Sequence, residues 1–257
     1  MKREHFNHDG LRFSYVDAGG EGEIVLALHA HWMSATSFSG LAEALLPDWR
    51  LIALDQRGQG HTDHAASYGR EDYLGDISAW LDHLGLRGPH AMIGHSLGGV
   101  NAYQFAARHP ERVKALVIED IGAEVGPSAD FILDWAGFFP TRDALAERLG
   151  PRLAFYLAPE FRETPQGWRL AFSPEEIVLS QRALAGDHWA DWLASSCPAL
   201  LVRGANSNIT TADHLAEMAR RRPNTQLVTL NGGHTVHIDD AEAFSSLVRT
   251  FLPRITE

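Results

Sequence analysis

Short apolar runs alternate with amphipathic helical patterns along most of this sequence, and this alternation restricts the possible folds more than any other feature. The runs are rich in valine, isoleucine and leucine and are apolar on both faces, which is typical of strands buried in a parallel sheet. They cover residues 11–16, 24–28, 51–54, 91–93, 113–118, 199–202 and 226–230. Helical patterns lie between them at residues 38–46, 72–84, 97–108, 212–221 and 241–251. The sequence therefore predicts an α/β protein with a mostly parallel central sheet and helices on both of its faces.

The composition of the 257 residues restricts the partners and surroundings of the protein. Lysine and arginine number 22 against 33 aspartate and glutamate residues, so the net charge of −11 disfavours nucleic acid as a partner. The one cysteine, Cys197, cannot form a disulfide within the chain, which suits a reducing compartment. The first residues lack the apolar run of a signal peptide, and no stretch approaches the ~18 apolar residues of a membrane span. We expect a cytoplasmic protein that does not bind membranes.

The alternation breaks between residues 121 and 192, where helical patterns continue but no strand is predicted. This segment is rich in aromatic residues, and several prolines divide it into short pieces. We predict that it forms an inserted helical lid over a site at the strand ends, with residues 1–120 and 193–257 as the core. Most of its aromatic side chains are expected to form the core of the lid itself. Those that we predict to face a substrate pocket are Trp135, Phe138, Phe139 and Trp168.

The pentapeptide Gly94-His95-Ser96-Leu97-Gly98 has the pattern Gly-x-Ser-x-Gly and lies between a predicted strand and a predicted helix. A sharp turn from strand to helix favours glycine two positions on either side of the serine, because a Cβ atom there would clash. Such a turn holds the Ser96 hydroxyl above the sheet, beside a helix N-terminus that favours developing negative charge. We therefore predict that Ser96 is a nucleophile; the alternative is a tight turn without chemistry.

Three further motifs accompany this turn, so that the pattern spans nearly the whole chain. They are Leu28-His29-Ala30-His31-Trp32, Asp55-Gln56-Arg57-Gly58-Gln59-Gly60 and Gly232-Gly233-His234. With these motifs the sequence resembles the α/β-hydrolase superfamily, including its esterase-like and (acetamidomethylene)succinate hydrolase-like members. The resemblance implies an oxyanion hole formed by the backbone N–H groups of His31 and Leu97. We also expect Trp32, beside that hole, and His95, at the serine turn, to line the substrate pocket. Ala30 stands where the family usually has glycine.

A histidine on the glycine-flanked loop at residues 231–234 can reach across the sheet edge to the serine. Imidazole can take up and return a proton near pH 7, and the resemblance implies the general base at this position, so we assign that role to His234. His237, three residues further on, is the competing candidate, and we expect it to pack at the start of the last helix. Other closely spaced histidines lack third and fourth ligands at a suitable spacing, so no metal site is predicted.

The carboxylate that should orient His234 is missing from its usual place. The family places it after the strand that is here 199–202, where this sequence has Ser207 or Asn208. A minority of the superfamily takes the acid from the end of the preceding strand, which here ends in Glu119 and Asp120. Strand alternation puts these two side chains on opposite faces, so only one can point into the site. Asp120 aligns with the aspartate of those relatives and is our predicted acid, with Glu119 or an inert loop as the alternatives.

Together these residues predict a hydrolase of a carboxylic ester, lactone or amide, in which Ser96, Asp120 and His234 act through an acyl-enzyme. We expect a small-molecule substrate and no cofactor, while the oligomeric state is not readable from the sequence. Carbon–carbon bond hydrolysis of vinylogous diketones uses the same triad and stays open. A cofactor-free dioxygenase of N-heteroaromatic substrates, using a histidine–aspartate dyad, ranks lower because the serine turn of those relatives differs. A hydrolase-fold binding protein with slow turnover is the remaining alternative.

Overall fold

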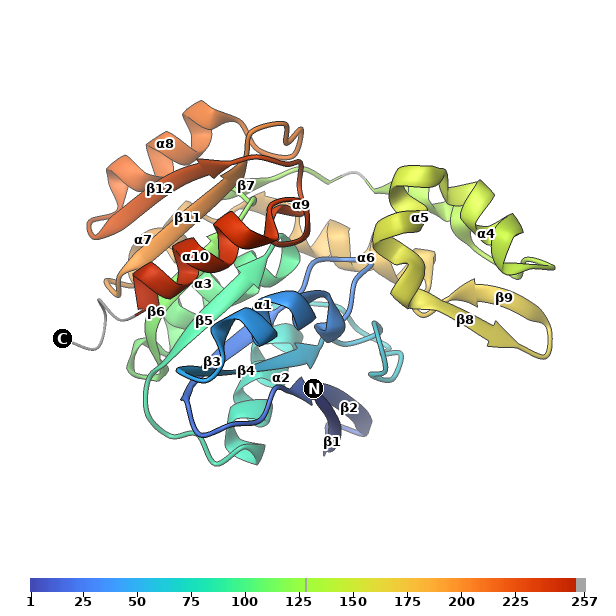
Figure 1. Cartoon of the computed structure of the whole chain (residues 1–257), viewed down its shortest axis with the longest axis horizontal. Helices are drawn as coiled ribbons and strands as arrows, with labels where there is room; N and C mark the ends of the chain where they lie inside the picture. The colour runs from blue at the N-terminus through green and yellow to red at the C-terminus, as the bar shows by residue number, and fades with distance from the viewer. Residues whose placement is uncertain (128, 253–257) are drawn as a thin grey trace.

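The computed structural model describes residues 1–127 and 129–252, and within them eight strands form one central sheet (Figure 1). In chain order these strands are β1 (Lys2–His8), β2 (Leu11–Asp17), β3 (Glu23–Leu28), β4 (Trp49–Asp55), β5 (His90–His95), β6 (Val113–Glu119), β11 (Ala199–Gly204) and β12 (Thr225–Leu230). Their order across the sheet is β1-β2-β4-β3-β5-β6-β11-β12. All neighbours from β4 to β12 in this order are parallel, which confirms the predicted mostly parallel sheet.

The first two strands differ from the sequence-based prediction. Strand β2 was expected among the buried parallel strands, but it runs antiparallel to both β1 and β4. The apolar pattern does not predict β1 at all, because only Phe6 of its seven residues is buried. An edge strand that packs one side chain into the core carries too little apolar periodicity to be recognised.

Helices cover both faces of the sheet, as predicted. One face carries the short 3-10 helix η1 (Ala35–Phe38) with α1 (Ser39–Leu45), α9 (Val236–Asp239) and α10 (Ala241–Phe251). The other carries α2 (Arg70–His83), α3 (Leu97–Arg108), α7 (Trp189–Ala194) and α8 (Ala212–Arg221), and the 3-10 helix η2 (Pro110–Arg112) leads into β6. Strand β3 shows the underlying alternation, because Leu26 and Leu28 join one apolar cluster while Val25 and Ala27 join the other. No helix within the described ranges is long and apolar enough to cross a membrane.

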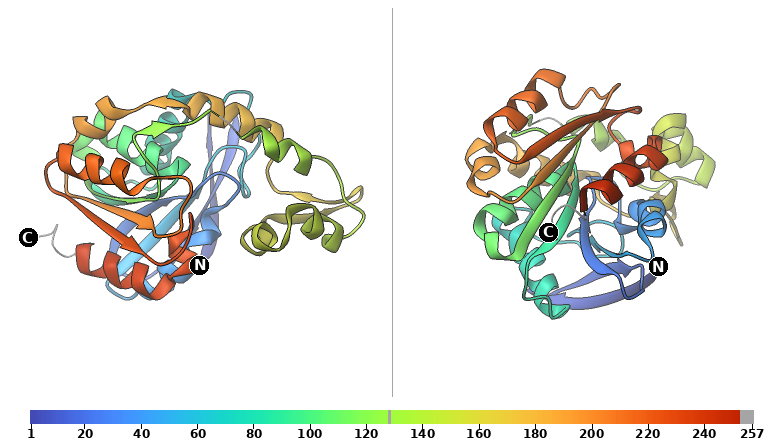
Figure 2. Two further views of the ribbon diagram at one scale, coloured as in Figure 1. Left: turned by 90° about the horizontal axis from the view of Figure 1, so that it is seen from above. Right: turned by 60° about the vertical axis from the view of Figure 1, so that its left-hand side comes forward.

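Residues 121–192, called the inserted segment below, connect the neighbouring strands β6 and β11. Its elements are β7 (Glu124–Val125), η3 (Asp130–Trp135), α4 (Arg142–Leu149), α5 (Pro151–Leu157), η4 (Ala158–Glu160), β8 (Phe161–Thr164), β9 (Gly167–Leu170), α6 (Pro174–Leu184) and β10 (Gly186–Asp187). Figures 1 and 2 show that the part from α4 to β9 extends away from the sheet. Residue 128 of the predicted lid and residues 253–257 of the predicted core lie outside the described residues.

The prediction that the inserted segment contains no strand is wrong. Strands β8 and β9 form an antiparallel hairpin, and β7 pairs with β10 near the two ends of the segment. These strands are two to four residues long, which is too short for an alternating pattern to be visible. The middle of the segment has an apolar cluster of its own, built around buried residues such as Ile132, Leu145 and Phe172. Its two ends, including Ile121 and Leu184, join the apolar cluster of one sheet face.

Two glycines allow α3 to approach the sheet closely. A Cβ atom on Gly98 would lie 2.0 Å from the carbonyl oxygen of Leu28, and one on Gly94 would lie 2.3 Å from the carbonyl oxygen of Gly98. Both neighbours are backbone atoms, so a side chain could be accommodated only by moving the helix or the strand. The two glycines of the pentapeptide therefore set the position of the serine turn on the sheet.

We predict that Gly98→Ala lowers the free energy of unfolding by about 2 kcal/mol or more, because the new methyl group overlaps the backbone of β3. Gly40→Ala is the control, since Gly40 lies in the exposed part of α1 and has open space around it. That change should leave the free energy of unfolding unchanged or slightly higher. Urea unfolding followed by circular dichroism measures both. Equal effects of the two substitutions would contradict the close approach described above.

Candidate active site

Ser96 occupies the turn between β5 and α3 with φ 52° and ψ −116°, a conformation that residues other than glycine rarely adopt. Its N–H group donates to the carbonyl oxygen of Glu119 on β6, at 3.0 Å. Its carbonyl oxygen accepts from Gly99 and Val100, at 2.9 and 3.2 Å, in the first turn of α3. The strained conformation is therefore held from both sides, by the sheet and by the helix. A partly exposed hydroxyl at the N-terminus of a 12-residue helix results.

The carboxylate of Asp120, directly after β6, is fully buried and accepts four hydrogen bonds. Its Oδ2 accepts from His234 Nδ1 at 2.7 Å and from Ser207 Oγ at 2.5 Å. Its Oδ1 accepts from Thr210 Oγ1 at 3.0 Å and from the N–H group of Gly204 at 3.2 Å. Because an ionised carboxylate can only accept, Nδ1 of His234 must carry a proton, which leaves Nε2 of the neutral ring as an acceptor.

The His234 side chain is 25% exposed, and a second histidine, His95, contacts it. His95 Nε2 donates to the carbonyl oxygen of His234 at 2.7 Å, and the centroids of the two rings lie 4.7 Å apart. Burial lowers the pKa of His95 to about 3, so its ring is neutral. Among the described residues, no hydrogen bond joins the His234 ring to Ser96 Oγ; in enzymes without substrate such contacts are often long.

Glu119, the neighbour of Asp120, forms a separate buried pair with His237. Its carboxylate accepts from the N–H group of His237 at 2.9 Å and from His237 Nδ1 at 2.7 Å. Burial alone would raise the pKa of Glu119, but His237 and His95 together lower it to about 2. Potential ligand atoms of His95, Glu119 and His237 lie within 4.8 Å of one another, so these three could reach one metal ion. Both oxygens of Glu119 accept hydrogen bonds from His237, whereas His95 Nδ1 and His237 Nε2 are buried without a partner among the described residues.

The loop after β3 presents the backbone of His31 and Trp32. Trp32 has φ 71°, and its N–H group donates to Gln59 Oε1 at 2.8 Å. The N–H groups of His31 and Leu97 make no hydrogen bond within the part of the chain that the structure describes. The His31 ring points elsewhere, since its Nε2 lies 2.8 Å from Ser180 Oγ and burial lowers its pKa to about 3. Two backbone donors are therefore free at the positions predicted for an oxyanion hole.

The residues predicted to line the substrate pocket lie in different environments. His95 is fully buried beneath His234. Trp135 is buried in the apolar cluster of the inserted segment and packs edge-on against Trp32, with ring centroids 5.3 Å apart. Phe139 and Trp168 pack partly buried against the same cluster, whereas the Phe138 side chain is 54% exposed. Trp32 is the residue through which the loop after β3 contacts this cluster.

Sequence reasoning did not predict the roles of three polar residues of this region. Ser207 stands near the position where the family usually has its acid, and its hydroxyl donates to Asp120 instead. Thr210 donates to the other oxygen of the same carboxylate, and Gln59 accepts from the loop after β3. The motif around Gln59 was visible in the sequence, but the roles of Ser207 and Thr210 depend on how one loop folds over another. No spacing in the sequence indicates such contacts.

Comparison with known proteins shows the family of this chain. The family described as alpha/beta hydrolase fold matches residues 23–241. A Bacillus subtilis (strain 168) protein, named as a candidate 2-succinyl-6-hydroxy-2,4-cyclohexadiene-1-carboxylate synthase, is 30% identical over 277 residues and covers 96% of this chain and 97% of its own. The 2-(acetamidomethylene)succinate hydrolase of Mesorhizobium japonicum (strain LMG 29417 / CECT 9101 / MAFF 303099) is 27% identical over 254 residues, covering 91% and 89%.

Solved structures of other proteins have the same fold as this chain. The crystal structure of E-2-(acetamidomethylene)succinate hydrolase aligns with a TM-score of 0.87 over 98% of this chain and 99% of the other, at 24% identity. The matching family model and this structural likeness define the class of the protein as an α/β hydrolase. The chain belongs to the α/β-hydrolase family.

We predict that Glu119→Gln lowers the free energy of unfolding by about 3 kcal/mol at pH 7, because it removes the buried carboxylate that accepts the hydrogen bonds of His237. The depressed pKa means that the Glu119 carboxylate stabilises the fold above its unfolded value near 4.5 and loses this contribution as the pH falls toward 2. The variant should therefore lose less stability than the parent between pH 5 and pH 3. Urea unfolding at several pH values, with exposed Glu43→Gln as the control, tests this. Parallel pH profiles of parent and variant would contradict it.

Proposed function

We propose that the protein hydrolyses a carboxylic ester, lactone or amide of a small-molecule substrate through a covalent acyl-enzyme. The observation that carries this proposal is the 2.7 Å contact between Asp120 Oδ2 and His234 Nδ1, on the same sheet edge as the strained Ser96 turn. A carboxylate that holds a partly exposed imidazole in one tautomer is the arrangement that activates a serine hydroxyl.

In the proposed reaction, Ser96 Oγ attacks the carbonyl carbon while His234 Nε2 takes the hydroxyl proton. The carbonyl π bond breaks, and the negative charge on its oxygen is stabilised by the N–H groups of His31 and Leu97. When the tetrahedral intermediate collapses, the bond to the leaving group breaks and His234 returns the proton to that group. Water, deprotonated by His234, then attacks the acyl carbon. The bond from this carbon to Ser96 Oγ breaks, and His234 returns the proton to Ser96 Oγ, which releases the acid and restores the enzyme.

The buried partners of Asp120 support its role as the acid in this scheme. The imidazolium ion that forms transiently on His234 is stabilised by the adjacent negative charge of Asp120. Ser207, Thr210 and Gly204 hold the Asp120 carboxylate in place by hydrogen bonds. With Asp120 as the acid, the site needs no second carboxylate after β11. The hydrolase named among the relatives agrees with the proposed class.

We predict a burst of nitrophenol when the protein is mixed with a short-chain nitrophenyl ester, and its loss in Ser96→Ala. The steady-state rate should fall by at least ~10³-fold, because no acyl-enzyme can form without the hydroxyl. Ser246→Ala, in the exposed part of α10, is the matched control and should keep the parent rate. An equal burst in Ser96→Ala would overturn the proposal.

Two further measurements distinguish the alternative functions. Oxygen uptake with a hydroxyquinolone as substrate would favour the dioxygenase. Cleavage confined to a vinylogous diketone would favour carbon–carbon bond hydrolysis.

We predict that Asp120→Asn lowers kcat by about 10⁴-fold, the loss seen when the equivalent charge is removed from a serine protease. An amide removes the charge and permits the wrong tautomer of His234. Asn208→Asp, which adds a carboxylate at an exposed position nearby, should leave kcat within about a factor of three. Steady-state kinetics on the best substrate from a panel of esters, lactones and amides measures both. A silent Asp120→Asn would show that another group orients the base.

A further inference from the structure

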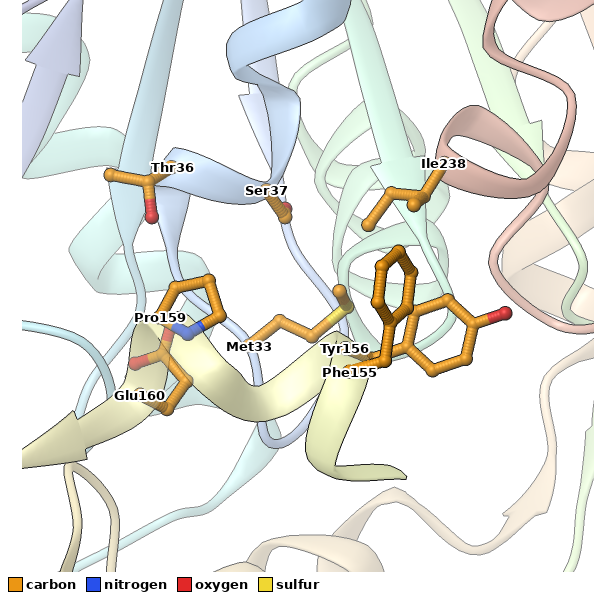
Figure 3. Close-up of a pocket in the computed structure, with 8 residues that line it drawn as sticks. All are labelled: Met33, Thr36, Ser37, Phe155, Tyr156, Pro159, Glu160 and Ile238. Atoms are coloured by element: carbon orange, nitrogen blue, oxygen red, sulfur yellow. The ribbon is translucent and has the colours of Figure 1, made fainter. Parts of the chain in front are cut away.

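A cavity of about 220 Å³, called the side cavity below, lies between the inserted segment and the core (Figure 3). Its lining residues are Met33, Thr36, Ser37, Phe155, Tyr156, Pro159, Glu160 and Ile238. Figure 3 shows that α5 and η4 contribute one wall, while the loop before η1, η1 itself and α9 contribute the other. None of Ser96, Asp120, His234, His31 or Leu97 lines it, so it is separate from the residues of the proposed reaction.

The polar wall of the side cavity contains buried atoms without partners. Glu160 is 2% exposed; its Oε1 accepts from Ser34 Oγ at 2.5 Å, and its Oε2 makes no hydrogen bond among the described residues. Ser37 Oγ is also buried without a partner within the described ranges. Because Ser34 gives its one proton to Glu160, the Thr36 hydroxyl must donate to Ser34, which leaves the lone pairs of Thr36 Oγ1 available. The side chains that line this wall therefore carry three oxygens with lone pairs that no hydrogen bond uses among the described residues.

The charge of this wall is negative when Glu160 is ionised, since Glu160 is the one charged residue among the described residues that line the cavity. Arg162 of β8 forms an ion pair with Glu160, with its Nη2 3.6 Å from Glu160 Oε2, and the ion pair of Arg3 with Asp55 acts from further away. His61 lies behind Arg162, 3.4 Å from its guanidinium. Burial raises the pKa of Glu160 to about 7 in spite of Ser34 and Arg162, so its negative charge is incompletely compensated.

The remaining walls are apolar and aromatic. Met33, Pro159 and Ile238 provide aliphatic surface, and Phe155 and Tyr156 provide two rings with centroids 5.3 Å apart. Phe155 is 68% exposed, which places it at the rim that faces solvent. A volume of 220 Å³ corresponds to roughly seven water molecules at ~30 Å³ each, and it suits a ligand of about six non-hydrogen atoms.

We propose that the side cavity is a binding site for a primary ammonium group carried on a short aliphatic chain. An ammonium ion has three N–H donors and no acceptor, which matches a wall of oxygen acceptors. Its positive charge supplies the compensation that Glu160 lacks, and its chain covers the aliphatic and aromatic surface. Water or a neutral alcohol could fill the same volume, but neither would balance the charge of the carboxylate.

The test is a calorimetric titration with n-pentylammonium chloride, with 1-pentanol as the uncharged probe of equal length. We expect saturable binding of the ammonium ion at pH 8, at least tenfold tighter than binding of the alcohol, because hydrogen bonds to charged groups are the stronger ones. Glu160→Gln preserves the shape of the side chain and should weaken ammonium binding at least tenfold. Glu163→Gln, at an exposed position on β8, is the matched control and should bind like the parent. Circular dichroism at equal temperature verifies that both variants are folded.

The pH dependence gives a second measurement. Pentylammonium keeps its proton up to about pH 10, so affinity should rise between pH 6 and pH 8 as Glu160 loses its proton, and this rise should be absent in Glu160→Gln. Ser96→Ala should bind like the parent, which separates this site from the proposed hydrolysis. Absence of saturable binding, equal binding of ammonium and alcohol, or unchanged binding in Glu160→Gln would each overturn the proposal.

Discussion

The candidate site depends on the hydrogen bond between the buried carboxylate of Asp120 and the ring of His234. Three parallel strands end together around it: Ser96 donates its N–H group to Glu119 of β6, and Asp120 donates its own to Val202 of β11. The parallel register thus brings the serine turn and the aspartate to one edge of the sheet. A carboxylate without solvent would be costly, and four hydrogen-bond donors offset that cost. One of these donors is the imidazole of His234, so burial of the charge and orientation of the ring have the same cause.

Two consecutive carboxylates hold two histidines of the same loop and helix. Asp120 binds His234, whose ring remains partly open to solvent, whereas Glu119 binds His237, which is fully enclosed. The neutral ring of His95 lies between them and donates to the backbone of His234. The enclosed pair holds the N-terminal part of α9, the helix that directly follows the His234 loop. A structural pair and a candidate reactive pair are therefore separated by one peptide bond.

The side cavity contacts the same two loops that carry the proposed reaction. Met33 lies two residues after His31, and Ile238 lies four residues after His234. The inserted segment supplies the opposite wall and is also connected to the His234 loop, because the Tyr156 hydroxyl donates to Asp239, which accepts from the N–H group of Gly233 at 2.6 Å. A ligand in the side cavity would therefore contact the core and the inserted segment together. Glu160 is buried between the core and the inserted segment, and a bound cation would balance its negative charge there.

The sequence alone determined the parallel sheet, the serine turn and the late histidine, because each rests on local information: apolar periodicity, glycine on either side of a serine, and a histidine after a strand. For the acid that orients His234, the sequence offered Glu119 and Asp120 as candidates. Asp120 was preferred because of the resemblance to members of the α/β-hydrolase superfamily. Only the tertiary structure decided which carboxylate meets His234, which hydroxyl groups surround it, and that Glu160 is buried. These contacts join residues 87 to 126 positions apart, and their geometry depends on strand register and loop packing that no local pattern encodes.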